Sequence, residues 1–322
     1  MKKVTSGKNT KHAGSGLVKD ISRSFCRTCE YALEKACGVI PDRVFVTFQY
    51  RSVMGRFPDL KNPVRLSEKM TWLKLYDRRP EYTSIVDKLE AKGLVAEKIG
   101  AEHVIPTLGC WSSAEEIDFS SLPERFVLKC THDSGSAVIV RNKAEINKKR
   151  LQAELRQKLG RNYYLHAREW QYKNVRPRII GEPYIPSLAN KESLEYKLTC
   201  FNGKVEFITI CRGIAHSNLD ARTNDFYDRD FNPLPFHCYY KNSVNPPVRQ
   251  KPDFMDEMIR YAERLSVNTP VMRVDFYFID GTIFFGEMTL YTWAAYTKFD
   301  PEDVDLLLGK KLRLPEKTSQ RI

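Results

Sequence analysis

Apolar side chains recur at helical spacing along the first third of the chain. In the stretch LSEKMTWLKLYDR, Met70, Leu73 and Tyr76 fall on one side of a helix, so this stretch is predicted to be an amphipathic helix. Ser67 stands where such a helix begins and is its expected N-cap. The stretch DKLEAKGLVAEKIG predicts a second helix, which should end at Gly100.

Three further segments of this region differ in composition and in the spacing of their apolar residues. Residues 19–40 carry a looser helical spacing of apolar residues and are predicted to be helical. Residues 48–66 contain proline and glycine and are expected to form a loop. Residues 1–18 consist mainly of Lys, Gly, Ser and Thr with little to bury, so a disordered basic tail is expected there.

From residue 124 onward the pattern favours strands. ERFVLKCTHDSGSAVIVR predicts a strand, a turn and a strand, and EYKLTCFNGKVEFITICRG and RVDFYFIDGTIFFGEMT each predict a hairpin. KPDFMDEMIRYAERLS predicts a helix, and residues 214–250 are expected to be irregular. A helical region over 19–123 thus precedes a strand-rich region over 124–315. This order predicts an α+β fold rather than a doubly wound parallel sheet.

Composition adds a partner class to this picture. The chain has 322 residues, of which 42% are hydrophobic, and a formal net charge of +12. Such a charge favours an anionic partner, and nucleic acid, a nucleotide, an acidic glycan and an anionic membrane surface remain candidates. The N-terminus is polar, and no run of about eighteen apolar residues occurs. We therefore expect a cytoplasmic protein without a membrane span.

The cysteines point to the same compartment. Eight are scattered through the chain, and only Cys26 and Cys29 form a CxxC pair. No second pair or nearby histidine pair completes a zinc quartet. We expect reduced, buried thiols, and a role for Cys26 and Cys29 stays open.

The last predicted hairpin, residues 273–289, concentrates charge on one face. Arg273 and Asp275 share a face of its first strand, and Glu287 and Thr289 share a face of its second. The turn brings Asp275 and Glu287 near each other, and opposed carboxylates are unstable without a cation between them. Two interpretations stay open. Either a magnesium ion sits there, or Arg273 neutralises Asp275 in a salt-bridged surface.

A second cluster of polar residues follows an earlier strand. Lys129 lies upstream of a short turn with Ser134, Gly135 and Ser136. Such a turn can present backbone N–H groups to phosphate oxygens, and the lysine can add positive charge. An ordinary hairpin turn explains the same residues. Glu182 ends the apolar strand of RIIGEPYI and is, by itself, one carboxylate on an edge strand.

The order of these pieces resembles the ATP-grasp superfamily, in which a nucleotide lies between two α+β lobes. The stretches LSEKMTWLKLYDR, FVLKCTHDSG, EYKLTCFNGK and RVDFYFIDGTIFFGEMT are similar to the teichuronopeptide-biosynthesis type of ATP-grasp protein, found in bacterial capsule and polysaccharide gene clusters. The resemblance covers roughly residues 45–315. It implies mostly antiparallel sheets, a small nucleotide-binding lobe over 124–181 and a metal- and substrate-binding lobe over 182–315.

The resemblance also implies a chemistry, namely ATP- and Mg²⁺-dependent joining of a carboxylate to an amine through an acyl phosphate. The residues it would assign to the phosphates are Lys88, Lys129, Asp133, Ser134, Gly135 and Ser136. Glu182 and Ile185 would frame the adenosine. The residues it would assign to the metal are Asp275, Glu287 and Thr289. Arg273, together with Lys129, would stabilise the reacting acyl phosphate.

Two departures from the family pattern stand out. Thr289 occupies the position of a magnesium-binding asparagine, which leaves a hydroxyl in place of an amide oxygen. The segment YTWAAY, residues 291–296, replaces a glycine-rich segment that often follows in the family. The second change alters whatever acceptor surface lies there.

The branch of the family implies the partners. An amino acid would be joined to a uronic acid or another carboxylate of a bacterial cell-surface glycan, and a polyanionic glycan suits the positive chain. Lys197 and Arg212 indicate an anionic substrate, although an exposed basic face explains them equally. Peripheral contact with the inner face of an anionic membrane is left open.

Two other function classes remain. One is a glycosyltransferase-like or non-catalytic glycan-assembly protein that keeps the fold, which the threonine at 289 favours. The other is a nucleic-acid-binding protein. Aromatic and basic residues alternate over 162–178, where bases could stack, but a helix with an apolar stripe explains that pattern too.

Overall fold

The structure is a computed structural model that describes residues 38–190, 192–213 and 221–316. Residues Asp42–Ile322 form one structural unit, separate from Met1–Pro41, and the description concerns the first of these. The predicted basic tail over 1–18 and the pair Cys26 and Cys29 lie outside the described residues, as does most of the helix predicted over 19–40.

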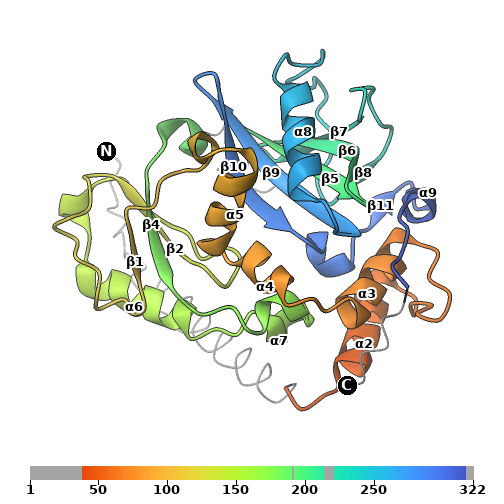
Figure 1. Cartoon of the computed structure of the whole chain (residues 1–322), viewed down its shortest axis with the longest axis horizontal. Coiled ribbons are helices and arrows are strands. Elements are labelled where there is room, and N and C mark those ends of the chain that lie inside the picture. The colour runs from red at the N-terminus through yellow and green to blue at the C-terminus, as the bar shows by residue number, and fades with distance from the viewer. Residues whose placement is uncertain (1–37, 191, 214–220, 317–322) are drawn as a thin grey trace, which may run out of the picture. The chain divides into compact units, whose positions relative to one another are not determined.

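Helices occupy the first part of the unit, as the hydrophobic pattern predicts (Figure 1). They are α2 (Asp42–Met54), α3 (Leu66–Tyr76), α4 (Glu81–Val86), α5 (Glu90–Ile99) and the 3-10 turn η1 (Ala101–His103). The predicted helix LSEKMTWLKLYDR is confirmed as α3, and α5 ends before Gly100 as expected. The loop prediction for 48–66 is wrong in its first part, because α2 continues through Met54.

The predicted N-cap is also wrong. Arg65 is the N-cap of α3, and Ser67 lies inside the helix, fully buried. The Ser67 hydroxyl donates to the Asp305 carboxylate at 2.6 Å, and its backbone N–H donates to the same group at 2.8 Å. The N-terminus of α3 is thus capped by a carboxylate from α9 (Asp303–Lys311), far along the chain.

A four-stranded antiparallel sheet follows, with the order β1-β4-β2-β3. Its strands are β1 (Gly109–Trp111), β2 (Phe126–Cys130), β3 (Val138–Val140) and β4 (Ile179–Pro183). Helix α6 (Lys148–Leu159) covers it, and Leu151 and Leu155 join the core of this sheet. Short helical turns fill the connections: η2 (Lys143–Glu145), α7 (Tyr164–Ala167), η3 (Trp170–Tyr172) and η4 (Pro186–Ala189).

A larger antiparallel sheet has the order β10-β9-β5-β6-β7. Its strands are β5 (Leu194–Phe201), β6 (Lys204–Arg212), β7 (Thr223–Asp228), β9 (Val271–Ile279) and β10 (Thr282–Thr289). Both predicted hairpins are confirmed, as β5–β6 and β9–β10. The expectation that 214–250 is irregular is wrong where β7 and β8 (His237–Cys238) lie. Strand β8 pairs with β11 (Phe299–Asp300).

Strand alternation gives this larger sheet two unlike faces. Leu198, Val274 and Phe276 point into the main core, where helix α8 (Met255–Leu265) packs against the sheet (Figure 1). The neighbouring positions in β5 and β9, such as Lys197 and Asp275, point to the opposite face. One face is therefore covered by a helix, and the other is polar.

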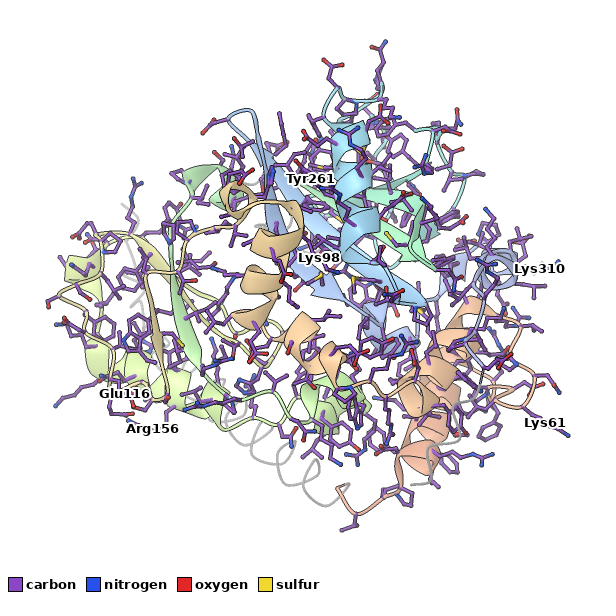
Figure 2. All side chains as sticks on the ribbon, in the orientation of Figure 1. Lys61, Lys98, Glu116, Arg156, Tyr261 and Lys310 are labelled. Atoms are coloured by element: carbon purple, nitrogen blue, oxygen red, sulfur yellow. The ribbon has the colours of Figure 1, made fainter. Side chains whose placement is uncertain are left out.

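Helices and antiparallel sheets together make the predicted α+β fold. Charged side chains such as Lys61, Arg156 and Lys310 project outward from the ribbon (Figure 2). Within the described part of the chain, no helix combines the length and apolar character needed to cross a bilayer.

Candidate active site

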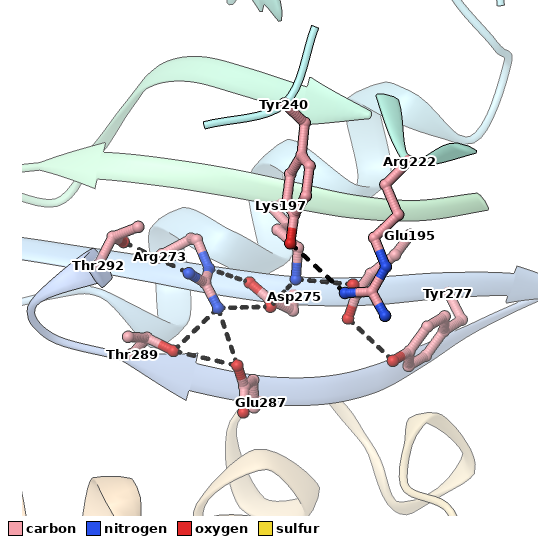
Figure 3. A network of polar contacts seen from close by, with 10 residues as sticks. All are labelled: Glu195, Lys197, Arg222, Tyr240, Arg273, Asp275, Tyr277, Glu287, Thr289 and Thr292. Atoms are coloured by element: carbon pink, nitrogen blue, oxygen red, sulfur yellow. Dashed lines mark hydrogen bonds and ion pairs between the residues drawn. The ribbon is translucent and has the colours of Figure 1, made fainter. Parts of the chain in front are cut away.

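The polar face of the five-stranded sheet carries a network of paired charges (Figure 3). Asp275 is fully buried and accepts two hydrogen bonds from Arg273, at 2.6 Å from Nε and 2.8 Å from Nη2. Lys197 Nζ lies 2.6 Å from the same carboxylate, and Arg273 Nη2 lies 2.8 Å from Glu287 Oε1. The structure therefore brings together four of the residues named from the sequence.

A β-bulge at Gly286 brings Glu287 opposite Asp275. The two-residue turn alone would place residue 286 opposite Asp275, whereas the register shifts between Phe285 and Glu287 so that Glu287 pairs with Asp275. A Cβ at Gly286 would lie 3.0 Å from the Tyr277 ring, tighter than an ordinary contact. Glycine at this position allows the bulge, and the bulge turns Glu287 and Thr289 onto the polar face.

Electrostatics hold the network in its ionised form. Burial alone would raise the pKa of Asp275, but Arg273 and Lys197 outweigh burial and keep that pKa below its usual value. Burial likewise opposes the charged form of Lys197, yet Asp275 and Glu195 raise its pKa above the ordinary value. For Glu195, burial dominates and raises the pKa. Two cations thus lie among three carboxylates, and burial favours the neutral form of one of these, Glu195.

Glu195 also belongs to this charge network, although it is not among the site residues named from the sequence. Lys197 Nζ lies 2.7 Å from its carboxylate, and the Tyr277 hydroxyl donates to it at 2.9 Å. A sequence signal for it exists, because Glu195 and Lys197 alternate on β5 as Arg273 and Asp275 do on β9. The pairing of these two strands, however, depends on the fold.

The residues assigned to magnesium present oxygen atoms on the polar face that could bind a cation. Glu287 is 43% exposed at its side chain, and Arg273 and Thr289 contact only its Oε1. The Thr289 hydroxyl lies 3.3 Å from that oxygen, while Asp275 is engaged by Arg273 and Lys197. Mg²⁺ usually takes one or two carboxylates plus substrate phosphates, so this donor set fits a cation that arrives with a nucleotide. No cluster of three acidic, His or Cys ligands occurs among the described residues.

The lysines assigned to the phosphates lie between the two sheets. Lys129 Nζ lies 2.7 Å from one oxygen of Glu182, and Lys92 Nζ lies 2.5 Å from the other. Burial would raise the pKa of Glu182, but the two lysines outweigh it and lower that pKa. Lys88 Nζ donates to the backbone carbonyl of Asp133, and burial lowers the pKa of Lys88.

The turn after β2 splits into exposed and buried parts. Ser134 and Gly135 line the cleft, and Gly135 has a φ of +76°, which favours glycine. Ser136 is buried, and its hydroxyl accepts the Cys130 N–H at 2.9 Å, so it supports the turn. The Asp133 carboxylate is also buried and has no hydrogen-bond partner among the described residues. A buried carboxylate without a hydrogen bond is costly, and the charge of nearby Lys88 offsets part of that cost.

A narrow apolar slot of about 200 Å³ opens beside these lysines. Its lining comes from both sheets and includes Val127, Ile139, Phe285 and Met288. Glu182 and Ile185, which the resemblance assigns to the adenosine, lie on its wall together with Tyr184. Apolar walls with a few polar groups at one edge are typical of a small-molecule site.

The slot adjoins a larger cleft of about 930 Å³. Lys88, Lys129 and Glu287 line both spaces, so one continuous surface runs from the slot to the charge network. The cleft continues along the polar face of β5, β6 and β7 past Thr209 and Asn224. Arg212 lies on the lining, where its Nε is 3.1 Å from Glu192.

A second buried charge pair stands at the cleft. Burial lowers the pKa of Lys74 to about 7 and raises the pKa of Glu169 to about 7, although each charge favours the other. Lys74 Nζ donates to the Ala294 carbonyl and to the Tyr296 hydroxyl, both at 2.8 Å. Glu169 lines the cleft. No sequence motif marks either residue, because the pair forms between distant segments.

A search of curated proteins found no match. Among solved structures, the chain is similar to a D-alanine–D-alanine ligase from Bacillus anthracis complexed with ATP (14% identity, TM-score 0.37, 69% of this chain). This chain spans 55% of the length of that ligase. It is also similar to the D-cycloserine synthetase DcsG (16% identity, TM-score 0.40, 72% of this chain and 71% of that one).

Another similar structure is the ATP-grasp ligase PsnB complexed with a minimal precursor, at 12% identity and a TM-score of 0.38, over 86% of this chain and 74% of that one. The family model described as TupA-like ATPgrasp matches residues 68–313. That range holds both sheets, the three lysines beside the slot and the whole charge network. The chain therefore belongs to the TupA-like ATP-grasp family.

Proposed function

We propose that this protein is an ATP- and Mg²⁺-dependent carboxylate–amine ligase. The observation that carries the proposal is the continuous surface on which an apolar slot with three lysines leads directly to the Arg273–Asp275–Glu287 network. Positive groups beside an apolar slot suit a nucleotide, and a further arginine beyond the slot suits a second anion that reacts with the nucleotide.

In this proposal the nucleotide base lies in the slot, against Glu182 and Ile185. Lys88 and Lys129 then neutralise phosphate oxygens, and the N–H groups at Ser134 and Gly135 add donors. Lys129 would exchange its present partner, Glu182, for phosphate. Catalysis in phosphoryl transfer is mainly positioning and charge neutralisation, which these residues supply without forming covalent bonds.

The reaction has two steps. A substrate carboxylate oxygen attacks the γ-phosphorus of ATP, ADP leaves with the electron pair, and an acyl phosphate forms. An amine then attacks the acyl carbon, inorganic phosphate leaves, and the amine loses a proton as the amide forms. Arg273 would stabilise the charge that builds on the acyl phosphate oxygens. Bound Mg²⁺, held by Glu287, Thr289 and Asp275, would supply charge neutralisation at the phosphates.

We further propose that the amine belongs to an amino acid and the carboxylate to a uronic acid or similar group of a bacterial cell-surface glycan. The net charge of +12 and the cations along the cleft support an acidic substrate. Such a reaction on glycan precursors would take place in the cytoplasm. Contact with the inner face of an anionic membrane would be peripheral.

A non-catalytic glycan-assembly role is the second candidate. One observation favours it: Asp275 is already satisfied by Arg273 and Lys197, and Thr289 stands where the family pattern has a stronger ligand. In that case the cleft would bind its ligand without consuming ATP.

Hydroxylamine trapping separates the two candidates. The full chain is incubated with ATP, Mg²⁺, a sugar acid such as methyl glucuronoside, and hydroxylamine, which converts an acyl phosphate into a stable hydroxamate. A ligase yields hydroxamate and an equal amount of ADP, and Glu287→Gln should lower the rate about 10²–10³-fold. Glu206→Gln is the matched control, because Glu206 is an ion-paired carboxylate on the same sheet outside the cleft. Nucleotide binding with neither product would favour the non-catalytic role.

A further inference from the structure

Two half-exposed aromatic rings stack on each other at the end of the large cleft. The ring centroids of Tyr239 and Trp293 lie 4.0 Å apart with an interplanar angle of 28°. Both residues line the cleft, and Tyr239 is 46% and Trp293 44% exposed. A flat apolar surface left open to water inside a cleft is a candidate contact for a ligand.

The backbone beneath these rings is held in an unusual conformation. Tyr239, Trp293, Ala294 and Ala295 all have positive φ, between +53° and +76°, which residues other than glycine rarely adopt. Side chains from elsewhere fix this arrangement. Lys74 Nζ donates to the Ala294 carbonyl at 2.8 Å, and the Tyr239 hydroxyl donates to the Tyr296 carbonyl at 2.5 Å. The aromatic surface is therefore built and supported, not a loose end of a loop.

The aromatic surface formed by Tyr239 and Trp293 lies close to the charge network. Thr292, directly before Trp293, accepts a hydrogen bond from Arg273 Nη1 at 3.5 Å (Figure 3). On the other side, the Tyr240 ring lies 6.3 Å from the Trp293 ring, and Arg222 Nη1 donates to the Tyr240 hydroxyl at 3.4 Å. The stacked rings thus lie next to residues that bind Arg273 and Arg222, near the site proposed for the acyl phosphate.

We propose that Tyr239 and Trp293 form the acceptor subsite for the ring of a sugar acid, with the carboxylate of that sugar directed toward Arg273. The inference rests on the proposed ligase function. The C–H groups on one face of a pyranose ring carry partial positive charge and pack well on the negative face of an aromatic ring. Guanidinium groups bind carboxylates with charge-assisted hydrogen bonds, so Arg222 and Arg273 give the subsite its preference for an acidic sugar.

The segment YTWAAY, residues 291–296, supplies one ring of this subsite. The glycine-rich segment that the resemblance to the family would lead us to expect there would offer no side chain to stack on a sugar. In this protein the same segment supplies Trp293, and Thr209 and Asn224 extend the polar lining beyond it. Substrate recognition is therefore expected to depend on Trp293 more than nucleotide binding does.

A binding experiment tests the inference. Wild-type protein saturated with Mg²⁺ and the non-hydrolysable analogue AMPPNP is titrated with methyl β-D-glucuronoside, methyl β-D-glucoside or succinate, and ligand-observed NMR gives each Kd. We expect the glucuronoside to bind most tightly. Trp293→Ala should weaken it at least tenfold, and should change the AMPPNP affinity less than twofold. Arg222→Gln should remove most of the preference for glucuronoside over glucoside.

Phe278→Ala is the matched control. Phe278 also stacks on an aromatic partner, Phe254, at 3.8 Å and is 38% exposed, but it does not line the cleft. It should leave the glucuronoside Kd unchanged. Circular dichroism and thermal unfolding of each variant report whether the fold is kept, and Trp293→Phe, which retains a ring, should keep most of the affinity.

The outcomes separate the subsite from the ligase function. Glucuronoside binding that Trp293→Ala does not weaken would overturn the subsite, as would an equal loss of AMPPNP affinity in that variant. Hydroxamate formed equally well from the glucuronoside in wild type and Trp293→Ala would also overturn it, while the ligase function would stand. Absence of AMPPNP binding in wild type would instead overturn the proposed function on which the subsite rests.

Discussion

At the scale of single residues, Asp275 is the buried carboxylate that the cations of the site surround. It is fully buried, and both its oxygens accept hydrogen bonds from cations. The sequence offered two interpretations of this aspartate, a metal ligand or the partner of Arg273. In the described structure it is the partner of Arg273 and Lys197, and a metal role would require at least one of these to turn toward the nucleotide.

The first prediction concerns the stability that Asp275 provides. Asp275→Asn leaves Arg273 and Lys197 buried beside a neutral amide, so it should lower the free energy of unfolding by about 3–5 kcal/mol at pH 7. Because its folded pKa is lowered, the stabilisation is present above the unfolded pKa of about 4 and is lost as the pH falls through the folded value. Urea denaturation at several pH values measures the difference in unfolding free energy between wild type and Asp275→Asn. A difference below about 1 kcal/mol at pH 7 would contradict a stabilising role of the charge network.

The second prediction concerns the buried pair Lys74 and Glu169, compared with the double variant Lys74→Met/Glu169→Gln. The raised pKa of Glu169 means that its contribution to stability is lost as the pH rises from about 4 to about 7. The lowered pKa of Lys74 means that its contribution is lost as the pH falls from about 10 to about 7. The stability of wild type relative to the variant should therefore be lowest near pH 7.

Unfolding free energies of both proteins at pH 5, 7 and 9 test this second prediction. Other ionisable groups occur in both proteins, so their effects largely cancel in the difference. A difference that is flat across this range, or largest at pH 7, would show that the two side chains do not titrate as their burial implies.

At the scale of elements, the β9–β10 hairpin determines which side chains reach the cleft. Its bulge at Gly286 moves Glu287 and Thr289 to the face of Asp275, and a regular hairpin would have turned them toward the core. The position of one glycine therefore controls the composition of the site.

The third prediction follows from this bulge. Gly286→Ala places a Cβ 3.0 Å from the Tyr277 ring and 3.1 Å from the Asp275 carbonyl, so it should destabilise the protein by about 1–3 kcal/mol and displace Glu287. Gly93→Ala is the control, because Gly93 lies inside α5 with no atom within 4 Å of the added Cβ. It should stabilise by about 0.5–1 kcal/mol. If both variants had the same unfolding free energy, the close packing at the bulge would be disproved.

The elements also show what can be read from the sequence. Hairpins with two-residue turns follow from local chemistry, so β5–β6 and β9–β10 were predictable. Helix α2 was partly missed because only Val46 and Tyr50 are buried, too few to give a stripe. Ser67 was misassigned because its true partner, Asp305, lies 238 positions away.

The same distinction applies to the candidate site. Arg273, Asp275 and Glu287 lie on one hairpin, so the turn predicted that they are close in space, but the bulge that puts Glu287 opposite Asp275 is seen only in the folded chain. Glu195 and the pair Lys74 and Glu169 join the site through contacts between distant segments. Only the folded chain places these residues, since neither a motif nor a spacing in the sequence connects them.

At the scale of the whole molecule, the cleft uses both sheets at once. The slot takes Val127 and Ile139 from one sheet, Phe285 and Met288 from the other, and cations from several elements. A ligand in the slot would contact both sheets, so nucleotide binding should stabilise the unit as a whole rather than one of its parts.

The fourth prediction is that AMPPNP with Mg²⁺ raises the free energy of unfolding by about 2.7 kcal/mol at a hundred times its Kd. Lys129→Met should weaken the AMPPNP affinity at least tenfold and reduce this gain, because it removes a charge beside the slot. Lys148→Met is the control, since Lys148 is an exposed lysine on α6 outside the slot. Thermal unfolding with and without nucleotide measures the stabilisation in both variants. Equal gains in the two variants would exclude Lys129 from the nucleotide site.

An isotope experiment shows whether the cleft activates a carboxylate with ATP. Methyl β-D-glucuronoside labelled with ¹⁸O in its carboxylate is incubated with the protein, ATP, Mg²⁺ and a mixture of amino acids, and the released phosphate is analysed by mass spectrometry. A ligase that forms an acyl phosphate transfers one ¹⁸O atom to inorganic phosphate for each amide formed. Phosphate released without label, or no phosphate release while AMPPNP still binds, would contradict the proposed ligase function.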